Sequence, residues 1–409
     1  IMDYDVIVIG GGAGGMAAAI ESDKVGAKTL LIEKENVLGG ILNQCIHNGF
    51  GLHHFKEELT GPEYANRYVQ ALKSTNVDVL YNTFVTNIES NKVEIVNDKV
   101  KQILNAKAIV LAMGCREKSA GSINLTGTRP VGIYTAGQVQ KMVNLYGKLP
   151  GKNVVILGSG DIGLIMARRL VFEGVNVEMV MEIMSQTSGL ARNIQQCLVD
   201  FNIPLLMNTT ITKVVGDKKV EGVYYAKVDE KFNVIKETEK FIECDCILLS
   251  VGLVPEFNIA KQLEVNRITN GTYVDEYRQT KEKGIFACGN VLHVHDLVDN
   301  VSEEAEIAGR NAGLFALNKL ELGPKYNVLC GEGVRYAIPN YVYQGENNVS
   351  LYFRSNKKYI KSNIIVECNG QPITKTFKLS ITPGEMQKID IDKSKILGDL
   401  VVKILPNEK

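Results

Sequence analysis

The chain has 409 residues, of which 45% are hydrophobic and 22% charged, and its formal net charge is zero. This length and hydrophobic content allow two or three domains with substantial cores. The balanced charge excludes an extended basic face of the kind that binds nucleic acid and a polybasic membrane anchor. With no signal-like start and no apolar run near the roughly 20 residues of a membrane span, we expect a cytoplasmic protein without membrane insertion.

The first chemical signal follows the first predicted strand. Residues 5–20, DVIVIGGGAGGMAAAI, run from an apolar strand through Gly10, Gly12 and Gly15 into an alanine-rich helix. In a GxGxxG loop the first glycine makes the turn, the second lets backbone approach a pyrophosphate, and the third lets the helix pack on the strand. The next strand, TLLIEK, ends in Glu33, where a carboxylate accepts hydrogen bonds from ribose hydroxyls. This combination predicts a dinucleotide-binding unit.

The same pattern recurs in residues 153–170, NVVILGSGDIGLIMARRL, with Gly158, Gly160 and Gly163. The following strand, VNVEMVME, ends in Glu182. A carboxylate at this place suits an unmodified ribose and repels a 2′-phosphate, and residues 183–189, IMSQTSG, supply no Arg or Lys to neutralise one. The second unit is therefore predicted to prefer NADH over NADPH.

After about residue 325 the pattern changes to short alternating strands, among them NNVSLYFRS, SNIIVECNGQPI and KTFKLSITPGEM. Strands about ten residues apart with NG and PG turns predict a small β-sandwich. This pattern is compatible both with a domain that only covers the protein and with a docking surface for a partner subunit.

Two nucleotide-binding units, the second inserted in the first, resemble the two-dinucleotide-domain flavoproteins of the pyridine nucleotide-disulfide oxidoreductase superfamily. AIVLAMGCREK resembles the linker that enters the second domain, LLSVGLVPE the strand that returns from it, and GIFACGNVLHVHD the motif that holds the flavin ribityl chain. The resemblance implies an α/β fold with two Rossmann-like domains and a C-terminal β-sandwich-like domain. The implied boundaries are 1–113 with 248–325 for FAD, 114–247 for NAD(H), and 326–409 for the small β domain.

The resemblance also implies the cofactor-binding residues. FAD would be bound by the first glycine loop, the end of the second strand and the later motifs: Gly10, Gly12, Ala13, Gly14, Gly15, Glu33, Lys34, Gly40, Asn48, Val85, Ala112, Gly114, Gly289, Asn290, Ser302 and Glu303. NADH would be bound by the second loop and its partners: Gly158, Gly160, Asp161, Gly163, Glu182 and Gly252.

Within the superfamily the sequence looks most like thioredoxin reductases. LTGPEYANRYVQAL resembles one of their helices, and VSEEAEIAGRNAG resembles their last FAD helix, whose N-terminus near Ser302 and Glu303 would lie by the flavin and stabilise its reduced anion. The redox cysteines are missing, because GIYTAGQVQ contains no cysteine and GGILNQCIHNG contains only Cys45. Asn290 also replaces the aspartate of the flavin motif.

RPVGIYTAGQVQ and GGILNQCIHNGFG are closer to the FAD subunits of amine, opine and cyanide-forming dehydrogenases, and to the oxidoreductases that accompany anaerobic glycerol-3-phosphate dehydrogenase. This resemblance implies an FAD-dependent enzyme that exchanges hydride with NADH and passes electrons to a partner redox protein or small acceptor. The alternatives are an FAD subunit of a glycerol-3-phosphate, amine or 2-hydroxyacid dehydrogenase complex and a single-cysteine NADH oxidase or peroxidase. A homo-oligomer is compatible with each.

Candidate catalytic residues lie in two short segments that contain all five histidines, residues 45–54 and 293–295. His47 and His295 are candidates for moving the proton that accompanies hydride, because imidazole titrates near neutral pH. Cys45 would form a sulfenic acid, attack a disulfide substrate, or only pack beneath the flavin loop. A metal site of His293, His295 and Asp296 is conceivable, but a flavin enzyme does not need one and we expect no metal.

Overall fold

The computed structural model of the protein describes residues 3–407. The chain forms two compact units, one that runs up to Cys115 and resumes at Pro255, and a second from Arg116 to Val254. The connecting segments β9 (Cys115–Glu117) and β18 (Leu253–Pro255) pair with each other. The mixed α/β fold with two parallel sheets agrees with the predicted fold class.

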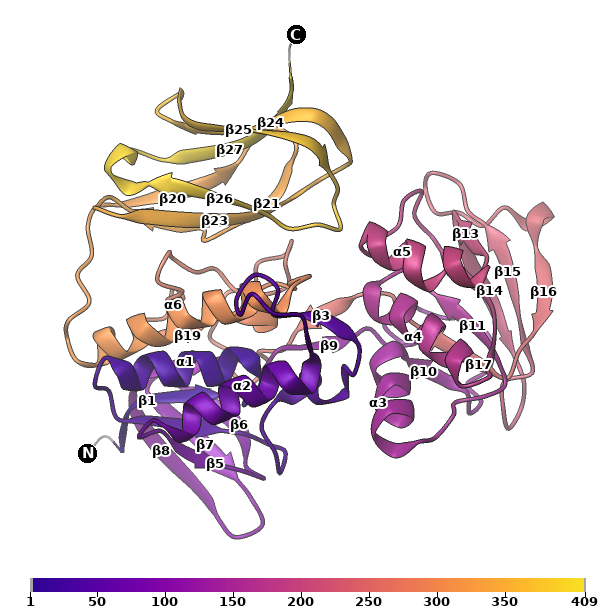
Figure 1. The fold of residues 1–409 in the computed structure, drawn as a ribbon, viewed down its shortest axis with the longest axis horizontal. Helices are drawn as coiled ribbons and strands as arrows, with labels where there is room; N and C mark the ends of the chain where they lie inside the picture. The colour runs from indigo at the N-terminus through magenta and orange to yellow at the C-terminus, as the bar shows by residue number, and fades with distance from the viewer. Residues whose placement is uncertain (1–2, 408–409) are drawn as a thin grey trace. The chain divides into compact units, whose positions relative to one another are not determined.

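The first unit is built on a seven-stranded sheet (Figure 1). Its strands in spatial order are β5 (Asp78–Leu80), β2 (Thr29–Ile32), β1 (Tyr4–Ile9), β8 (Lys101–Leu111), β7 (Lys92–Val96) and β6 (Phe84–Glu89), with β19 (Ile285–Ala287) also beside β8. The neighbouring strands β5, β2, β1, β8 and β19 pair in parallel. Strands β6, β7 and β8 form an antiparallel meander. The central strands are apolar along their length because both faces of the sheet are covered.

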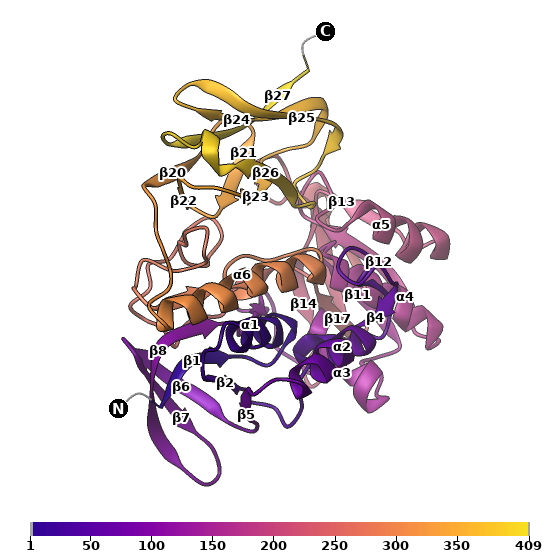
Figure 2. The ribbon, with the colours of Figure 1, turned by 60° about the vertical axis from the view of Figure 1, so that its left-hand side comes forward.

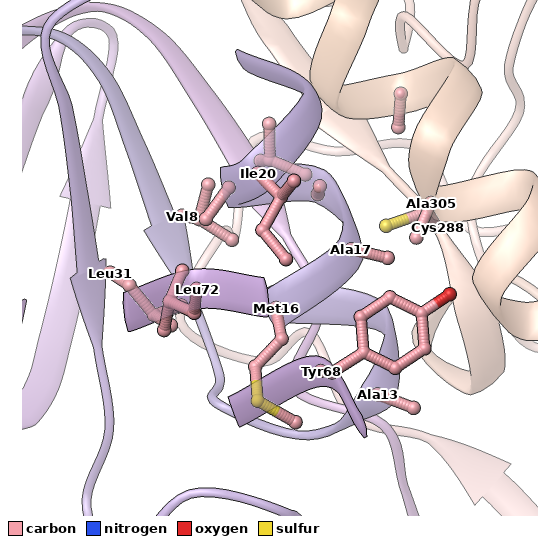
Figure 3. Packing of buried hydrophobic residues seen from close by; sticks show 14 of the residues in the cluster. Val8, Ala13, Met16, Ala17, Ile20, Leu31, Tyr68, Leu72, Cys288 and Ala305 are labelled. Carbon is pink, nitrogen blue, oxygen red and sulfur yellow. The ribbon is translucent and has the colours of Figure 1, made fainter. Parts of the chain in front are cut away.

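Three helices cover one face of this sheet: α1 (Ala13–Lys24), α2 (Gly61–Lys73) and α6 (Val298–Ala316). Figure 3 shows Met16, Ala17 and Ile20 of α1 packed between strand residues and Tyr68 of α2, with Ala305 of α6 nearby. The shorter elements of this unit are η1 (Gly40–Gln44), β3 (Asn48–Phe50), β4 (Leu59–Thr60) and η4 (Gly289–Val291).

The second unit contains a parallel sheet and a smaller antiparallel sheet. The parallel sheet has the order β10 (Ile133–Thr135), β17 (Cys246–Leu249), β11 (Asn153–Leu157), β12 (Asn176–Glu182) and β13 (Leu205–Met207). The antiparallel sheet consists of β14 (Thr209–Val215), β15 (Gly222–Lys227) and β16 (Lys240–Glu243). Its helices are α3 (Ala136–Tyr146), α4 (Asp161–Phe172), α5 (Ala191–Cys197), η2 (Val199–Phe201) and η3 (Lys236–Thr238).

The C-terminal strands belong to the first unit and form two sheets that share one apolar core. The larger sheet has the order β22 (Tyr341–Tyr343), β20 (Lys325–Cys330), β27 (Leu400–Pro406), β24 (Tyr359–Cys368) and β25 (Gln371–Ile381). The smaller consists of β21 (Val334–Ile338), β23 (Asn348–Ser355) and β26 (Gln387–Asp392), and η5 (Lys393–Lys395) follows it. The smaller sheet lies on the side nearest α6 (Figure 2). We call these residues, 325–406, the β domain.

The packing of α6 on α1 depends on Gly309. A Cβ at this position would lie 2.0 Å from the backbone oxygen of Ala18 on α1. Contacts below 3.0 Å force the helices apart, and the small residues of both helices leave no flexible side chain to move aside.

We therefore predict that Gly309→Ala lowers the free energy of unfolding by about 3 kcal/mol, although alanine is the better helix former. Urea unfolding followed by circular dichroism measures this change. Arg310→Ala, at an exposed position of the same helix, is the control and should change stability by less than about 0.5 kcal/mol. A variant at Gly309 that is as stable as the original protein would contradict the close packing.

Candidate functional site

The first glycine loop connects β1 to α1 in a form that only glycine permits. Gly10 has a φ of 103°, and a Cβ on Gly15 would lie 1.6 Å from the oxygen of Gly10. The buried carboxylate of Glu33 holds this loop, because Oε2 accepts the backbone N–H of Gly11 at 2.7 Å. Its Oε1 accepts the N–H of Glu35 at 2.8 Å. The carboxylate therefore lies beside the loop, where the sequence placed a ribose-binding group.

The second glycine loop repeats this arrangement in the other unit. Gly158 has a φ of 95°, and a Cβ on Gly163 would lie 2.5 Å from the Cβ of Ser250. Glu182 is buried, and its Oε2 accepts the N–H of Ser159 at 3.0 Å while its Oε1 accepts that of Met184 at 2.9 Å. In both loops the glutamate thus binds the residue after the first glycine and the residue two positions after itself.

The helices that follow the two loops are capped differently from their neighbours. Helices α2 and α3 begin with capping boxes, Thr60 with Glu63 and Thr135 with Gln138. Helices α1 and α4 have glycine N-caps, Gly12 and Gly160, which provide no side-chain cap. In α4 the N–H of Gly163 donates to the Ser250 hydroxyl at 3.1 Å. The helix dipole favours negative charge at both N-termini. These loops fit the pyrophosphates of FAD and of a nicotinamide dinucleotide.

Two other residues predicted to bind NAD, Asp161 and Gly252, form hydrogen bonds with neighbouring segments of the second unit. Asp161, the first residue of α4, accepts the N–H of Leu190 at 2.8 Å and the amide of Asn193 at 2.7 Å. These bonds tie the loop after β12 to the N-terminus of α4. The backbone oxygen of Gly252 accepts the N–H of Lys118 at 3.0 Å.

The motif predicted to hold the ribityl chain forms a left-handed turn at Gly289, whose φ is 73°. Its N–H donates to Oε1 of Glu304 at 2.8 Å. The side chain of Asn290 accepts the N–H of His295 at 2.9 Å, and its amide lies 3.7 Å from the sulfur of Cys115. Both residues of the motif are therefore held by the segment that follows them.

Glu304 is the centre of a buried cluster that we call the Glu304 hub, formed with Arg278, His293 and His295. Besides Gly289, Oε1 accepts Nε2–H of His295 at 3.1 Å. Oε2 accepts Nε–H of Arg278 at 3.1 Å and Nε2–H of His293 at 3.0 Å. The side chains of all four are at most 1% exposed. Each carboxylate oxygen thus has two donors, which is what a buried charge requires.

The hub sets the protonation of its members. Burial alone would raise the pKa of Glu304, but His293, His295 and Arg278 hold that pKa well below its usual range, so the carboxylate is ionised. Burial lowers the pKa of His293 to about 4, against the opposing effect of Glu304, so His293 is neutral near pH 7. Neutral His293 donates from Nε2 and accepts at Nδ1, where the hydroxyl of Tyr336 lies at 3.4 Å.

The hub contains three side chains whose types can bind a metal ion. The ligand atoms of His293, His295 and Glu304 lie within 4.8 Å of one another. The expected third member, Asp296, instead pairs with Arg354 at 3.3 Å and accepts the N–H of Met386. In this structure Arg278 and three further N–H groups donate to the Glu304 oxygens.

Cys45 and His47 lie between η1 and β3 in half-buried positions. The Cys45 thiol donates to the oxygen of Ile41 at 3.3 Å, and its backbone oxygen accepts the N–H of Gly61 at the start of α2. His47 places Nδ1 3.0 Å from the oxygen of Asn48 and its ring 4.9 Å from that of Phe50. The exposed Asn48 pairs with Thr60 in the short β3 to β4 sheet.

The next two histidines contact α6. The N–H of His53 donates to Asp299 at 2.8 Å, and His54 lies 2.9 Å from the hydroxyl of Tyr68 and 3.5 Å from Glu306. His54 lines a cavity of about 190 Å³ beside α1, α2 and α6. This cavity is lined by the outer part of α1 and by none of the loop residues 10–12.

One site prediction needs correction. The last FAD helix was expected to begin near Ser302 and Glu303, but α6 begins at Val298. Ser302 is fully buried and lies 2.7 Å from the Tyr64 hydroxyl, whereas Glu303 accepts the hydroxyl of Tyr352 at 2.8 Å. The helix starts earlier because residues 298–301 continue the helical pattern, so both side chains lie in its second turn and contact protein.

The remaining predicted FAD residues lie along the same unit. Gly40 approaches Gly12 closely, because a Cβ on Gly40 would lie 3.1 Å from the Gly12 Cα. Lys34 is exposed at the end of β2, and Val85 is half-buried in β6. Ala112 donates its N–H to the oxygen of Ile9, which continues the pairing of β8 with β1, and the oxygen of Gly114 accepts the N–H of Glu256 at 3.1 Å. The neighbouring Ala13 and Gly14 are buried in the first turn of α1.

The family model for pyridine nucleotide-disulphide oxidoreductases matches residues 4–312. The chain belongs to this family. Curated relatives include the mitochondrial dihydrolipoyl dehydrogenase of Caenorhabditis elegans, 26% identical over 85% of this chain and 74% of its own length. One of the opine oxidase subunits of Agrobacterium tumefaciens is 24% identical over 78% of this chain and 66% of its own length. Thioredoxin reductase of Bacillus subtilis is 25% identical over 70% of this chain and 86% of its own length. The family carries out flavin-dependent redox chemistry with FAD and NAD(P)H.

Two solved structures share the fold. Thioredoxin reductase from T. acidophilum has a TM-score of 0.62 and 23% identity, covering 77% of this chain and 98% of that one. An NAD-dependent persulfide reductase from A. fulgidus has a TM-score of 0.57 and 20% identity, covering 95% and 71%. Among residues 3–407, none of the helices combines the length and apolar character needed to span a bilayer.

Sequence reasoning missed Glu304 and Arg278 of the Glu304 hub, and Tyr336 and Arg354, which continue its hydrogen bonds. One signal was present, because Glu304 lies four residues before Ala308 on the small-residue face that α6 buries. An acidic residue on a buried helix face needs paired donors. Which residues donate is decided by segments distant in sequence.

Protonation of His293 should make stability pH-dependent. Because its folded pKa of about 4 is below the ordinary value, the unfolded chain binds a proton on acidification from about pH 6.5 that the folded protein does not. The free energy of unfolding therefore falls with falling pH through this window, by up to about 1.4 kcal/mol per pH unit.

Urea unfolding at several pH values between 4.5 and 7.5 measures this slope. His293→Gln keeps an N–H donor for Glu304 but does not titrate, so its slope should be smaller by the contribution of one proton. The groups that face His293 are Glu304, His295, Arg278 and Tyr336, and all are retained in this variant. Equal slopes in the two proteins would show that His293 does not titrate differently on folding.

Proposed function

We propose that the protein is an FAD-dependent oxidoreductase that takes hydride from NADH and passes electrons to a separate acceptor. The observation that carries this proposal is the repeated loop, with Glu33 and Glu182 bonded in the same way to two glycine turns in two units. The first unit would hold FAD and the second NADH. Bound FAD would supply the hydride-accepting chemistry that amino-acid side chains lack.

The residues of the first unit would bind and orient FAD. The uncapped N-terminus of α1 would receive the pyrophosphate, Glu33 would accept ribose hydroxyls, and the Gly289 turn would approach the ribityl chain. The N-terminus of α6, at Val298, would direct its dipole to the negative charge that reduction creates. Orientation and charge stabilisation are the protein's contributions to such a reaction.

The second unit supports a preference for NADH. The Glu182 carboxylate is buried and also accepts the hydroxyl of Ser159, which in turn accepts the N–H of Ser188 at 3.0 Å. A 2′-phosphate would meet this carboxylate, and the segment from Ile183 to Leu190 has no cation to offset the repulsion.

His295 is less suited to proton transfer than the sequence suggested. Its ring is fully buried and donates to Glu304, so we assign it a role in positioning the Gly289 turn. His47 is half-buried beside Asn48 and remains the candidate proton carrier.

The acceptor is proposed to be a partner redox protein or a small molecule. The match to one of the opine oxidase subunits favours the related alternative, an FAD subunit of a dehydrogenase complex. A single-cysteine NADH oxidase or peroxidase is the other alternative, because Cys45 is half-buried next to the β3 segment.

Anaerobic mixing with NADH or NADPH tests the main proposal. We expect the absorbance of the bound flavin near 450 nm (about that wavelength for oxidised flavin) to fall rapidly with NADH and at least tenfold more slowly with NADPH. If neither nucleotide reduces the flavin, NADH is not the donor, and the alternative of a dehydrogenase subunit gains support. Glu182→Ala should lower the ratio of the flavin reduction rate with NADH to the rate with NADPH, since it removes the charge that repels the 2′-phosphate. An unchanged ratio would exclude Glu182 as its cause.

Replacing Cys45 separates the peroxidase alternative. With Cys45→Ser we expect NADH oxidation with an artificial acceptor such as ferricyanide to stay within about twofold of the original rate. A hydrogen peroxide assay is run beside it, with Cys330→Ser as an exposed-thiol control. Peroxide turnover that is substantial in the original protein and collapses only in Cys45→Ser would establish the thiol enzyme instead.

A further inference from the structure

We propose that the β domain is part of the flavin site, because a chain of hydrogen bonds from Arg354 through Tyr336, His293 and Glu304 holds the Gly289 turn in place. This inference rests on the proposed binding of FAD to the first unit. It assigns a function to a domain for which the sequence allowed either a passive cover or a docking surface.

The donors run from Arg354 through Tyr336 and His293 to Glu304, and Gly289 donates to Glu304 from the other end. Nε–H of Arg354 donates to the Tyr336 oxygen at 3.2 Å, and the Tyr336 hydroxyl lies 3.4 Å from Nδ1 of His293. Neutral His293 donates from Nε2 to Glu304, and Glu304 accepts the N–H of Gly289. Because a neutral imidazole has one donor and one acceptor, the bond to Glu304 makes Nδ1 the acceptor for Tyr336.

Arg354 connects the β domain to the loop that follows the Gly289 turn. Its Nη2 donates to the oxygen of Val294 at 3.1 Å and to Asp296 at 3.3 Å, both in the loop between Asn290 and α6. Its Nη1 donates within the β domain, to the oxygens of Pro383 and Gly384. One guanidinium therefore connects β23 and the β25 to β26 turn with the 294–296 loop, using its fork of donors.

A second contact lies one turn along α6. Glu303 accepts the hydroxyl of Tyr352 at 2.8 Å and pairs with Lys388, so β23 and β26 also hold the start of this helix. Figure 2 shows the sheet of β21, β23 and β26 facing α6. The 294–296 loop and the start of α6 are thus bonded directly to the β domain, and the Gly289 turn is bonded to it through Glu304 and His293.

The turn depends on this support because Gly289 is left-handed and its N–H would otherwise be buried without an acceptor. Glu304 can accept that N–H only while it is ionised and correctly placed, which the surrounding donors ensure. Loosening the chain at Tyr336 or Arg354 should therefore move the turn, although neither residue is proposed to touch FAD. Both are positioning residues.

The test compares Tyr336→Phe with Tyr359→Phe. Each removes one hydroxyl from a tyrosine that is less than 10% exposed, but the Tyr359 hydroxyl bonds Asn356 inside the β domain, away from the hub. FAD is titrated into flavin-stripped protein, and the dissociation constant is measured from quenching of FAD fluorescence. The visible circular dichroism and the midpoint potential of the bound flavin are recorded at saturating FAD.

We expect Tyr336→Phe to weaken FAD binding about fivefold to tenfold, the effect of losing roughly one buried hydrogen bond, and to shift the flavin circular dichroism or potential. Tyr359→Phe should stay within twofold with an unchanged flavin signal. Arg354→Lys, which keeps the charge but loses the fork of donors, should weaken binding in the same direction and serves if Tyr336→Phe does not fold.

Unchanged FAD affinity and flavin signals in both Tyr336→Phe and Arg354→Lys would overturn the inference. Equal weakening by Tyr336→Phe and Tyr359→Phe would also overturn it, since it would indicate general destabilisation. Failure of the original protein to bind FAD is a different result, because it would overturn the proposed function itself.

Discussion

A carboxylate buried against the backbone N–H of a glycine turn is the interaction on which this structure depends. Three such contacts are those of Glu33 with Gly11, Glu182 with Ser159 and Glu304 with Gly289. Hydrogen bonds to a charged acceptor contribute about 1.5–3 kcal/mol each, and a buried carboxylate without them would be strongly destabilising. Each glutamate therefore fixes the conformation of a glycine turn by accepting one of its backbone N–H groups.

The three carboxylates differ in how they are satisfied. Within residues 3–407, Glu33 and Glu182 accept nearby backbone N–H groups, and Glu182 also accepts one serine hydroxyl. Their other lone pairs can accept hydroxyls of a ribose. Glu304 has two donors on each oxygen, three of them from side chains. The first two are suited to ligand binding, whereas Glu304 is suited to supporting the turn beside the ligand.

This difference gives the C-terminal strands a role that their fold alone does not predict, since a sandwich by itself implies no chemistry. Arg354 and Tyr352 of these strands directly contact residues between Asn290 and the second turn of α6. Electron transfer needs a flavin held in one orientation. A domain that supports the flavin-binding segment therefore contributes to function without a reactive group of its own.

The sequence by itself determined the two nucleotide loops, the glutamates that follow them, the helix of residues 61–73 and the β character of the last 80 residues. These are local patterns, since glycine spacing, strand apolarity and turn residues act over a few positions. The start of α6 was misplaced by four residues because its N-cap, Leu297, makes no side-chain cap bond of the kind that marks a helix start in the sequence. Tertiary structure alone decided the Glu304 hub and its link to Arg354. The hub joins Arg278, His293 and His295 to Glu304 from separate segments, and the β domain adds Tyr336 and Arg354 only where it packs against them. A buried charge constrains its partners by geometry, and sequence spacing does not encode that geometry.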